Sequence, residues 1–316
     1  MALGKHLSYL FPSIGDTEDF VFIAKQTGQS LDTMRNFRFL QCDYTTMKEG
    51  YEKTANEFLE LASEQRLAIL LKVQNEPVKV SIIAKELEAT VPEVYRNFDR
   101  LVKADLISKN ADGSYSITTI GKILVSQISL IGFLSANKKY FKSHDLKDLQ
   151  GKYIQRIGAL ENGQHIKGFV KVLEKWKEIY SNANEYISNI LYEVPYTPDL
   201  IETIAKKANA GVKIRSVFSE SAIVSKERKQ AFDKLGFKKM IEDGRIERKM
   251  SKSVKITVIV NEKEACVMFP TFEGEVDMSE AFYANNDSVF HEWCLDYFND
   301  SWNSAGPFHE SKLGKE

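Results

Sequence analysis

Apolar residues recur at helical spacing through residues 61–103, and this pattern predicts three consecutive helices. The second helix is short and follows Pro77, and Thr90 and Glu93 open the third at the spacing of a capping box. The residues expected on the buried faces are Leu61, Leu67, Leu70 and Leu71, then Ile82, Ile83 and Leu87, and finally Val94, Phe98, Leu101 and Val102.

A strand, a turn and a second strand are expected directly after the third helix. Leu106–Lys109 and Ser114–Thr118 supply the strand patterns, and Asn110–Gly113 between them has the composition of a tight turn. Three helices followed by a hairpin are typical of a winged helix-turn-helix, which presents one helix to the major groove of DNA. We therefore predict this fold for residues 48–125.

The outward side of the third helix and the hairpin supply candidate DNA contacts. Arg96 has the forked donor geometry that reads a guanine edge, and we expect Arg96 and Arg100 to matter more for sequence choice than the wing lysines. The residues expected to contact double-stranded DNA are Thr90, Pro92, Tyr95, Arg96, Asn97, Arg100, Lys103 and Lys109. In the alternative interpretation, the two arginines form surface pairs with Glu93 and Asp99, and the unit binds only proteins.

The charge of this region is modest for a DNA-binding unit. Residues 48–145 carry 14 Lys or Arg against 13 Asp or Glu, whereas DNA-binding domains are usually clearly basic. A low net charge weakens non-specific affinity more than it excludes specific binding. The whole chain has a formal charge of −1, which gives it no general affinity for polyanions.

The 316 residues allow two domains with separate cores, and 43% hydrophobic content is ordinary for a soluble protein. The longest apolar candidate, Ile117–Leu134, is interrupted by polar residues, so no membrane span is expected. The first residues lack the pattern of a secretion signal. Three widely spaced cysteines (Cys42, Cys266 and Cys294) argue against a disulfide framework. We therefore expect a cytoplasmic protein.

A long helix is expected over Thr118–Tyr140, with more apolar surface than one winged helix can cover. Such a surplus favours contact with a second copy of the chain or with a following domain. The residues expected to form a homodimer contact are Ile120, Leu124, Ile128 and Ile131. Residues 118–165 are expected to connect the two halves, and residues 1–47 are expected to be a weakly ordered extension.

Helix and strand patterns alternate from residue 166 onward, which predicts an α/β layer domain over 166–305 followed by a flexible tail over 306–316. An amphipathic helix precedes a buried strand at Tyr186–Val194, and a helix opened by Pro198 precedes a strand at Val212–Phe218. The remaining expected elements are a helix at Ser225–Leu235, strands at Arg245–Lys249, Lys255–Val260 and Ala265–Phe269, and a final helix from about Asp287.

The chain resembles archaeal winged-helix transcriptional regulators that carry the middle domain of the methanogenesis regulatory protein type. The resemblance covers about 50–305 and is carried by Tyr140–Leu146 and Ile154–Gly158, with support from Ala210–Ile214 and Phe298–Trp302. It implies a regulatory role. A more distant similarity to archaeal sugar-responsive regulators implies that the second domain is like half a phospholipase D.

Enzyme interpretations do not fit the residues. Phospholipase-D chemistry needs His-x-Lys-x4-Asp, and after His165 and Lys167 the acid position holds Val172. Winged-helix-fronted methyltransferases need a glycine-rich loop, and Leu191–Pro198 has no glycine. His291 and Cys294 form at most half a metal site. We therefore predict no catalysis, no cofactor and no metal.

Charge is segregated near the carboxyl end. Residues 226–255 hold 11 Lys or Arg against 5 Asp or Glu, whereas 256–316 hold 3 against 12. This basic run can be a solvated face, or it can border a pocket for an anionic effector or form an auxiliary DNA surface. A pocket is expected where loops leave the strand ends, with Glu193, Tyr196 and Glu220 as its polar groups.

Overall fold

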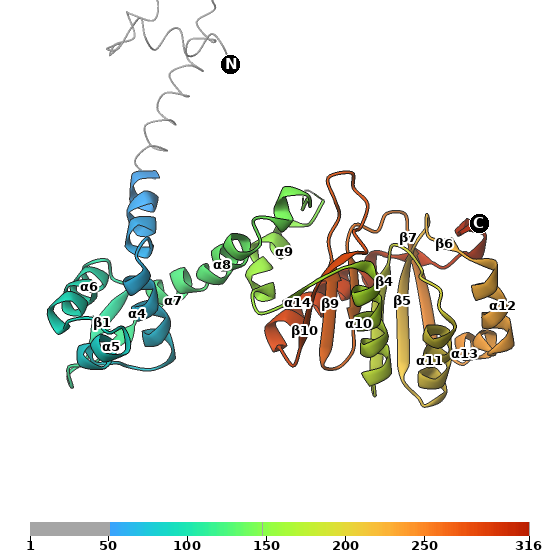
Figure 1. Cartoon of the computed structure of the whole chain (residues 1–316), viewed down its shortest axis with the longest axis horizontal. Coiled ribbons are helices and arrows are strands. Elements are labelled where there is room, and N and C mark those ends of the chain that lie inside the picture. The colour runs from blue at the N-terminus through green and yellow to red at the C-terminus, as the bar shows by residue number, and fades with distance from the viewer. Residues whose placement is uncertain (1–50, 147, 316) are drawn as a thin grey trace, which may run out of the picture. The chain divides into compact units, whose positions relative to one another are not determined.

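The computed structural model describes residues 51–146 and 148–315, so the extension expected over 1–47 lies outside the described residues. The chain divides into two compact units between Ile123 and Leu124. The first unit is a winged helix-turn-helix, as predicted, and the second is a mixed α/β unit (Figure 1). Each unit has its own core.

The first unit begins with a helix over 51–61. The elements that follow are α4 (Glu64–Asn75), α5 (Val80–Glu86), α6 (Val91–Lys103), β1 (Ile107–Lys109), β2 (Tyr115–Ile117) and α7 (Thr119–Val125). Strands β1 and β2 pair antiparallel as the predicted wing, and Val78 adds a bridge to Tyr115. Gly113 has a φ of 80° in the wing turn, a conformation that glycine adopts without a steric penalty.

The core of this unit confirms most of the predicted faces. Val94, Phe98 and Leu101 of α6 are fully buried, and Val102 is half-buried. The first predicted helix differs from the structure, because it is interrupted near Ser63. The Ser63 side chain caps α4 by accepting a hydrogen bond from the amide of Arg66. The break rotates the apolar face, so Leu71 is exposed while neighbouring apolar residues of α4 are buried. Those buried residues of α4 are Ile69, Leu70 and Val73.

The second unit begins at Leu124, within α7, and its further described elements run from α8 to β12. Its helical elements are α8 (Ile128–Ala136), η1 (Tyr140–Lys142), α9 (Gly151–Gln155), η2 (Ile157–Leu160), α10 (Phe169–Asn182), α11 (Pro198–Asn209), α12 (Lys226–Lys234), α13 (Phe237–Glu242), α14 (Ser288–Ser304) and η3 (Glu310–Lys312). Its strands are β3 (Gln164–Lys167), β4 (Tyr186–Leu191), β5 (Lys213–Ser219), β6 (Ile223–Val224), β7 (Ile246–Ser251), β8 (Thr257–Val260), β9 (Glu264–Met268), β10 (Glu280–Asn285), β11 (Gly306–Pro307) and β12 (Gly314–Lys315).

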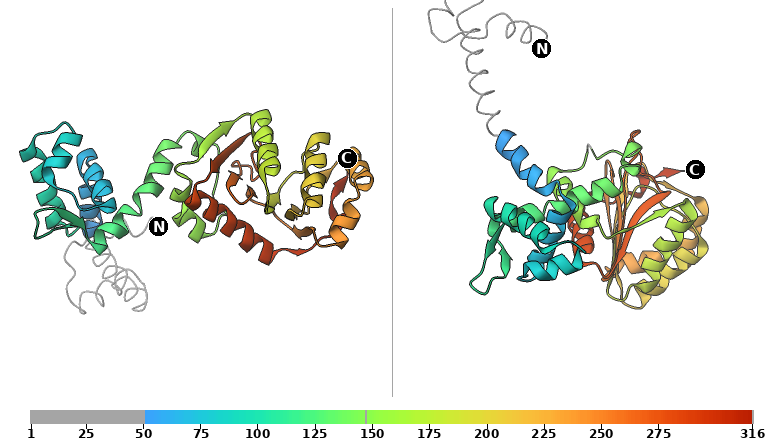
Figure 2. Two further views of the ribbon diagram at one scale, coloured as in Figure 1. Left: turned by 90° about the horizontal axis from the view of Figure 1, so that it is seen from below. Right: turned by 60° about the vertical axis from the view of Figure 1, so that its left-hand side comes forward.

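An eight-stranded sheet organises the second unit in the order β11-β7-β5-β4-β8-β9-β10-β3. Strands β4, β5 and β7 are parallel, and the other pairs are antiparallel. Alternate residues face opposite sides, so Ile259 of β8 packs with α10 and α11 while Val258 and Val260 pack with α14. Helices α10, α11 and α13 cover one face, whereas α14, α8 and η2 cover the other (Figures 1 and 2).

Two sequence expectations fail at the edges of this unit. The predicted helix over Thr118–Tyr140 is divided into α7 and α8 at Ser126 and Gln127. Residues 306–315, expected as part of a flexible tail, instead form β11, η3 and β12, which pair with β7 and β6. Strand pairing decides the second case, because residues 306–315 have no strong local pattern of their own.

The stretch Thr119–Ala136, which spans α7 and α8, is apolar and long enough to cross a membrane as judged by length and composition alone. The expectation that no run reaches such a length is therefore wrong. Core helices of soluble proteins meet the same criterion, but only 17% of this stretch is buried. Most of this stretch therefore exposes its apolar side chains.

Candidate nucleic-acid interface and effector cavity

Helix α6 begins differently from the predicted capping box. Thr90 is the N-cap residue, but its side chain makes no capping bond. The Glu93 carboxylate instead accepts from the Gln65 side chain at 2.6 Å, because α4 lies against α6. Thr90 and Pro92 are exposed at the start of the helix. The helix start therefore depends on a tertiary contact that the local sequence does not encode.

Two side chains on the outer face of α6 stand open to solvent. Tyr95 is 51% exposed, and Arg96 beside it is also exposed. Within the described part of the chain, Arg96 makes neither an ion pair nor a hydrogen bond. An arginine without a partner gives up no protein contact when it binds a base edge or a phosphate.

Three other predicted DNA contacts are engaged within the protein. The Asn97 amide donates to the Gln65 side chain at 2.6 Å. Lys103 pairs with Asp99 at 2.7 Å. Arg100 is bound by Glu60 rather than by either of the carboxylates considered from the sequence. Only Arg96 among the arginines and lysines expected on α6 is therefore unpaired in the described structure.

The wing carries Lys109 at the end of β1. Its ammonium group lies 5.9 Å from the centre of the Tyr115 ring, and the lysine remains exposed. Asn110 donates to the hydroxyls of Ser114 and Ser116, which orders the turn. The wing thus presents a positive side chain on a structured hairpin.

The residues expected at a dimer contact are distributed along α7 and α8. Ile120 and Ile131 are exposed, and Leu124 and Ile128 are half-buried. Ile123 and Leu134, which belong to the same apolar face, are also exposed. The two helices therefore leave apolar side chains on their surface.

The three residues expected at an effector pocket do not line the cavity that the second unit forms beside α12. Glu193 is exposed, Tyr196 is half-buried against the core, and Glu220 pairs with Lys312 at 2.7 Å. A cavity of about 630 Å³ lies instead beside α12, α13, β7 and the last residues of the chain, and none of the three lines it. Its wall includes Arg228 and Arg248 from the basic run noted in the sequence. The excess of basic residues over 226–255 was the feature of the sequence that could have indicated this cavity.

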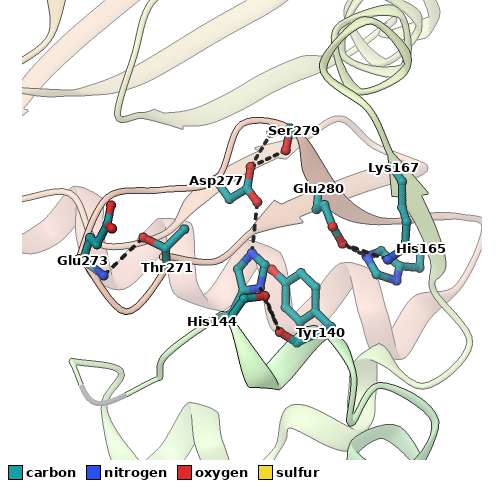
Figure 3. A network of polar contacts seen from close by, with 10 residues as sticks. Tyr140, His144, His165, Lys167, Thr271, Glu273, Asp277, Ser279 and Glu280 are labelled. Atoms are coloured by element: carbon teal, nitrogen blue, oxygen red, sulfur yellow. Dashed lines mark hydrogen bonds and ion pairs between the residues drawn. The ribbon is translucent and has the colours of Figure 1, made fainter.

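A network of polar contacts surrounds Tyr140 and His144, which lie in the segment Tyr140–Leu146 (Figure 3). The His144 ring stacks on Tyr140 at 3.6 Å, and its two nitrogens face the Tyr140 carbonyl at 2.9 Å and the Asp277 carboxylate at 3.2 Å. The Ser143 hydroxyl also lies 3.1 Å from the nitrogen that faces the Tyr140 carbonyl. Asp277 also accepts from the Ser279 amide and hydroxyl. This network joins η1 to the loop before β10.

The His-x-Lys pair lies on the edge strand β3. His165 and Lys167 both contact Glu280 of β10, at 2.7 and 3.2 Å. Burial lowers the pKa of His165, although Glu280 opposes the shift. Val172 is buried in α10, so the acid needed beside this pair is not there. The pair acts as a strand-to-strand contact.

The residues considered for a metal site or a redox pair make other contacts or are buried. The His291 ring meets the Asn261 carbonyl at 2.7 Å and the Tyr186 hydroxyl at 3.2 Å. Burial raises the pKa of Cys266 to about 12 and also raises that of Cys294. No group of three or more His, Cys, Asp or Glu side chains suited to a metal occurs in 51–146 or 148–315.

The chain matches no protein-family model and no curated protein sequence. Among solved structures, it is similar to TrmBL2, an archaeal chromatin protein, at 16% identity over 77% of this chain and 92% of that one, with a TM-score of 0.36. Nuc, a phospholipase D family member from Salmonella typhimurium, matches at 14% identity over 47% of this chain and 99% of its own, with a TM-score of 0.34. MarR from Listeria monocytogenes matches at 19% identity over 46% and 98%, with a TM-score of 0.24. With TM-scores this low, the fold assignment rests on the chain's own elements.

Proposed function

We propose that the chain is a sequence-specific DNA-binding regulator of transcription. The observation that carries this proposal is the outer face of α6, where Arg96 is exposed and unpaired in the described structure and Tyr95 stands beside it. Base reading requires side chains with free donors on a helix that fits the major groove. The chain is proposed to act in the cytoplasm.

A homodimer is the proposed working form. Palindromic operators are bound by paired recognition helices, and the exposed apolar side chains of α7 and α8 offer a surface for a second copy. A bilayer is a poorer partner for this stretch, because Lys122, Ser126 and Gln127 interrupt it and would enter the apolar phase. The proposal therefore includes a protein partner and no membrane.

The α/β unit is proposed to sense a small molecule or a partner and to have no catalytic activity. Support comes from the His165 pair, which lacks the acid of phospholipase-D chemistry, and from Leu191–Pro198, which lacks the glycines of a cofactor loop. An effector bound there would change DNA binding by favouring one arrangement of the dimer.

Selection from random DNA duplexes at physiological salt tests the DNA-binding proposal. The expected result is a recurring, two-fold symmetric motif that the full chain enriches and that Arg96→Ala enriches weakly. A matched control is Arg245→Ala, which removes an arginine from the second unit. Failure of the parent chain to enrich any sequence would overturn the proposal and favour a winged helix that binds only proteins.

A further inference from the structure

The cavity beside α12 is built from both apolar and charged groups. Phe218, Phe232 and Phe308 provide aromatic walls from β5, α12 and the segment after β11, and Leu313 adds an aliphatic one. Its volume of about 630 Å³ is within the range of roughly 300–1,000 Å³ that small-molecule sites occupy. The C-terminal residues lie next to α12 and complete the wall, since β12 pairs with β6 (Figures 1 and 2).

Two arginines in this wall lack an anionic partner in the described structure. Arg228 is only 9% exposed, and its guanidinium carbon lies 4.7 Å from the centre of the Phe232 ring. Arg248 lies 4.1 Å from the centre of the Phe308 ring. The Nε atoms of both are buried without a hydrogen-bond partner. Buried charges are normally paired, because removing an ion from water without compensation is costly.

The electrostatic environment of these arginines supports the same conclusion. Burial lowers the pKa of Arg228 to about 10; Tyr180 opposes this shift, and the charge of Arg248 adds to it. Burial also lowers the pKa of Arg248, and Glu310 opposes that shift. Each guanidinium is thus less stable as a cation here than in water. An anion placed between them would relieve both penalties.

The other charges around the cavity leave it positive. Lys226, Lys229 and Lys238 line it together with the two arginines, against Asp233, Glu242 and Glu310, so its formal charge is +2. Lys229 and Glu310 are 3.7 Å apart and partly neutralise each other. A dianion would balance the net charge. The forked donors of arginine suit a phosphate, which can accept from two guanidinium groups at once.

We propose that this cavity binds a phosphate monoester with an aromatic or apolar body, its phosphate held by Arg228 and Arg248 and its body packed among Phe218, Phe232 and Phe308. Aromatic rings beside the guanidinium groups fix their planes, so the donors are oriented before the ligand arrives. This assignment goes beyond the DNA-binding proposal, and its test contains no DNA. A failure here therefore leaves the role of α6 untouched.

Calorimetric titration of the full chain with phenyl phosphate, inorganic phosphate, benzoate and benzyl alcohol tests the proposal. Phenyl phosphate should bind at least tenfold more tightly than each of the other three, because it alone has both the dianion and the ring. Equal binding of benzoate would overturn the phosphate assignment, and undetectable binding of phenyl phosphate would overturn the site.

Variants separate a ligand-binding role from a structural one. Arg228→Met and Arg248→Met should each weaken phenyl phosphate binding at least tenfold, while the thermal midpoint without ligand stays the same or rises as a buried unpaired charge is removed. Arg245→Met is the matched control, because Arg245 already pairs with Asp243 and Asn209 and should leave binding unchanged. Undiminished affinity in Arg248→Met would contradict the proposal even if Arg228→Met fails to fold.

Discussion

Arg100 and Glu60 form a two-point ion pair, with the Nε and Nη2 atoms of Arg100 donating to the two carboxylate oxygens at 3.1 and 2.6 Å. The same carboxylate lies 3.3 Å from Arg66, which also donates to the backbone carbonyls of Glu60 and Leu59. Glu60 therefore joins the helix over 51–61 to α6. Arg100 thus forms a contact within the protein, although the sequence predicted it, like Arg96, to contact DNA.

The two arginines of α6 should differ in their effect on DNA binding. Arg96→Ala should cost about 1–3 kcal/mol of binding free energy and relax the preference at one base position. Arg100→Ala should cost less binding free energy than Arg96→Ala, because Arg100 must give up its two hydrogen bonds to Glu60 before it can reach DNA. Fluorescence anisotropy with the selected duplex at fixed salt measures both. Equal losses in the two variants would show that Arg100 exchanges Glu60 for DNA at little cost.

Ile131→Asp should convert the proposed dimer into a folded monomer. Ile131 is 43% exposed on α8, and a carboxylate there would be buried against the second copy without a partner. Sedimentation velocity should show the change, with operator affinity falling as well. Val170→Asp is the control, because Val170 is an exposed apolar residue on α10, away from this surface. A monomeric parent chain that floats with lipid vesicles would point to a membrane partner instead.

Gly158→Ala should destabilise the second unit by about 1–3 kcal/mol, the usual range for overpacking. A Cβ atom at Gly158 would lie 2.4 Å from the Leu130 amide nitrogen and 2.7 Å from the Ser129 carbonyl carbon, so α8 and η2 would have to separate. Urea unfolding followed by circular dichroism measures the change. Gly151→Ala, which meets no atom within 4 Å, is the control and should be nearly neutral. Similar urea midpoints for both variants would mean that α8 can move away from η2 at little cost in stability.

Asp277→Asn should make stability less sensitive to acid. Burial alone would raise the pKa of Asp277, but bonds from Ser279 and His144 hold it below its ordinary value. Because the pKa of Asp277 is lower in the folded state than in the unfolded state, its ionised form stabilises the fold at pH values above the unfolded-state pKa of about 3.9. This contribution disappears as the pH falls through the folded-state pKa. The variant should lose about 1–3 kcal/mol at pH 7 through its weakened network and show a flatter slope below about pH 4.

Urea titrations between about pH 2 and 7 follow the Asp277→Asn effect. Asp148→Asn is the matched control, since Asp148 is an exposed carboxylate paired with Lys255 at 3.1 Å. It should change stability by no more than about 0.5 kcal/mol at neutral pH. An unchanged slope in Asp277→Asn would assign the acid sensitivity to other carboxylates.

The sequence alone determined the winged helix-turn-helix, because its signals are local. The burial of Val94, Phe98 and Leu101 follows from their spacing on one helix, and the wing follows from two short strand patterns around a glycine turn. Alternation of helix and strand likewise indicated an α/β unit. Strands β3 and β10 were not predicted, because they form by pairing with each other although they lie far apart in the sequence.

Tertiary structure decided which polar groups meet. Glu60 and Arg100 are 40 residues apart, and His144 and Asp277 are 133 residues apart. Neither contact could therefore be predicted from the spacing of residues along the sequence. The cavity beside α12 shows the same limit. The basic run was evident from composition, but only the folded chain brings Arg228 and Arg248 to one cavity beside three phenylalanines. Periodicity reports which side of an element is buried, whereas the partners of a buried charge depend on how the elements pack.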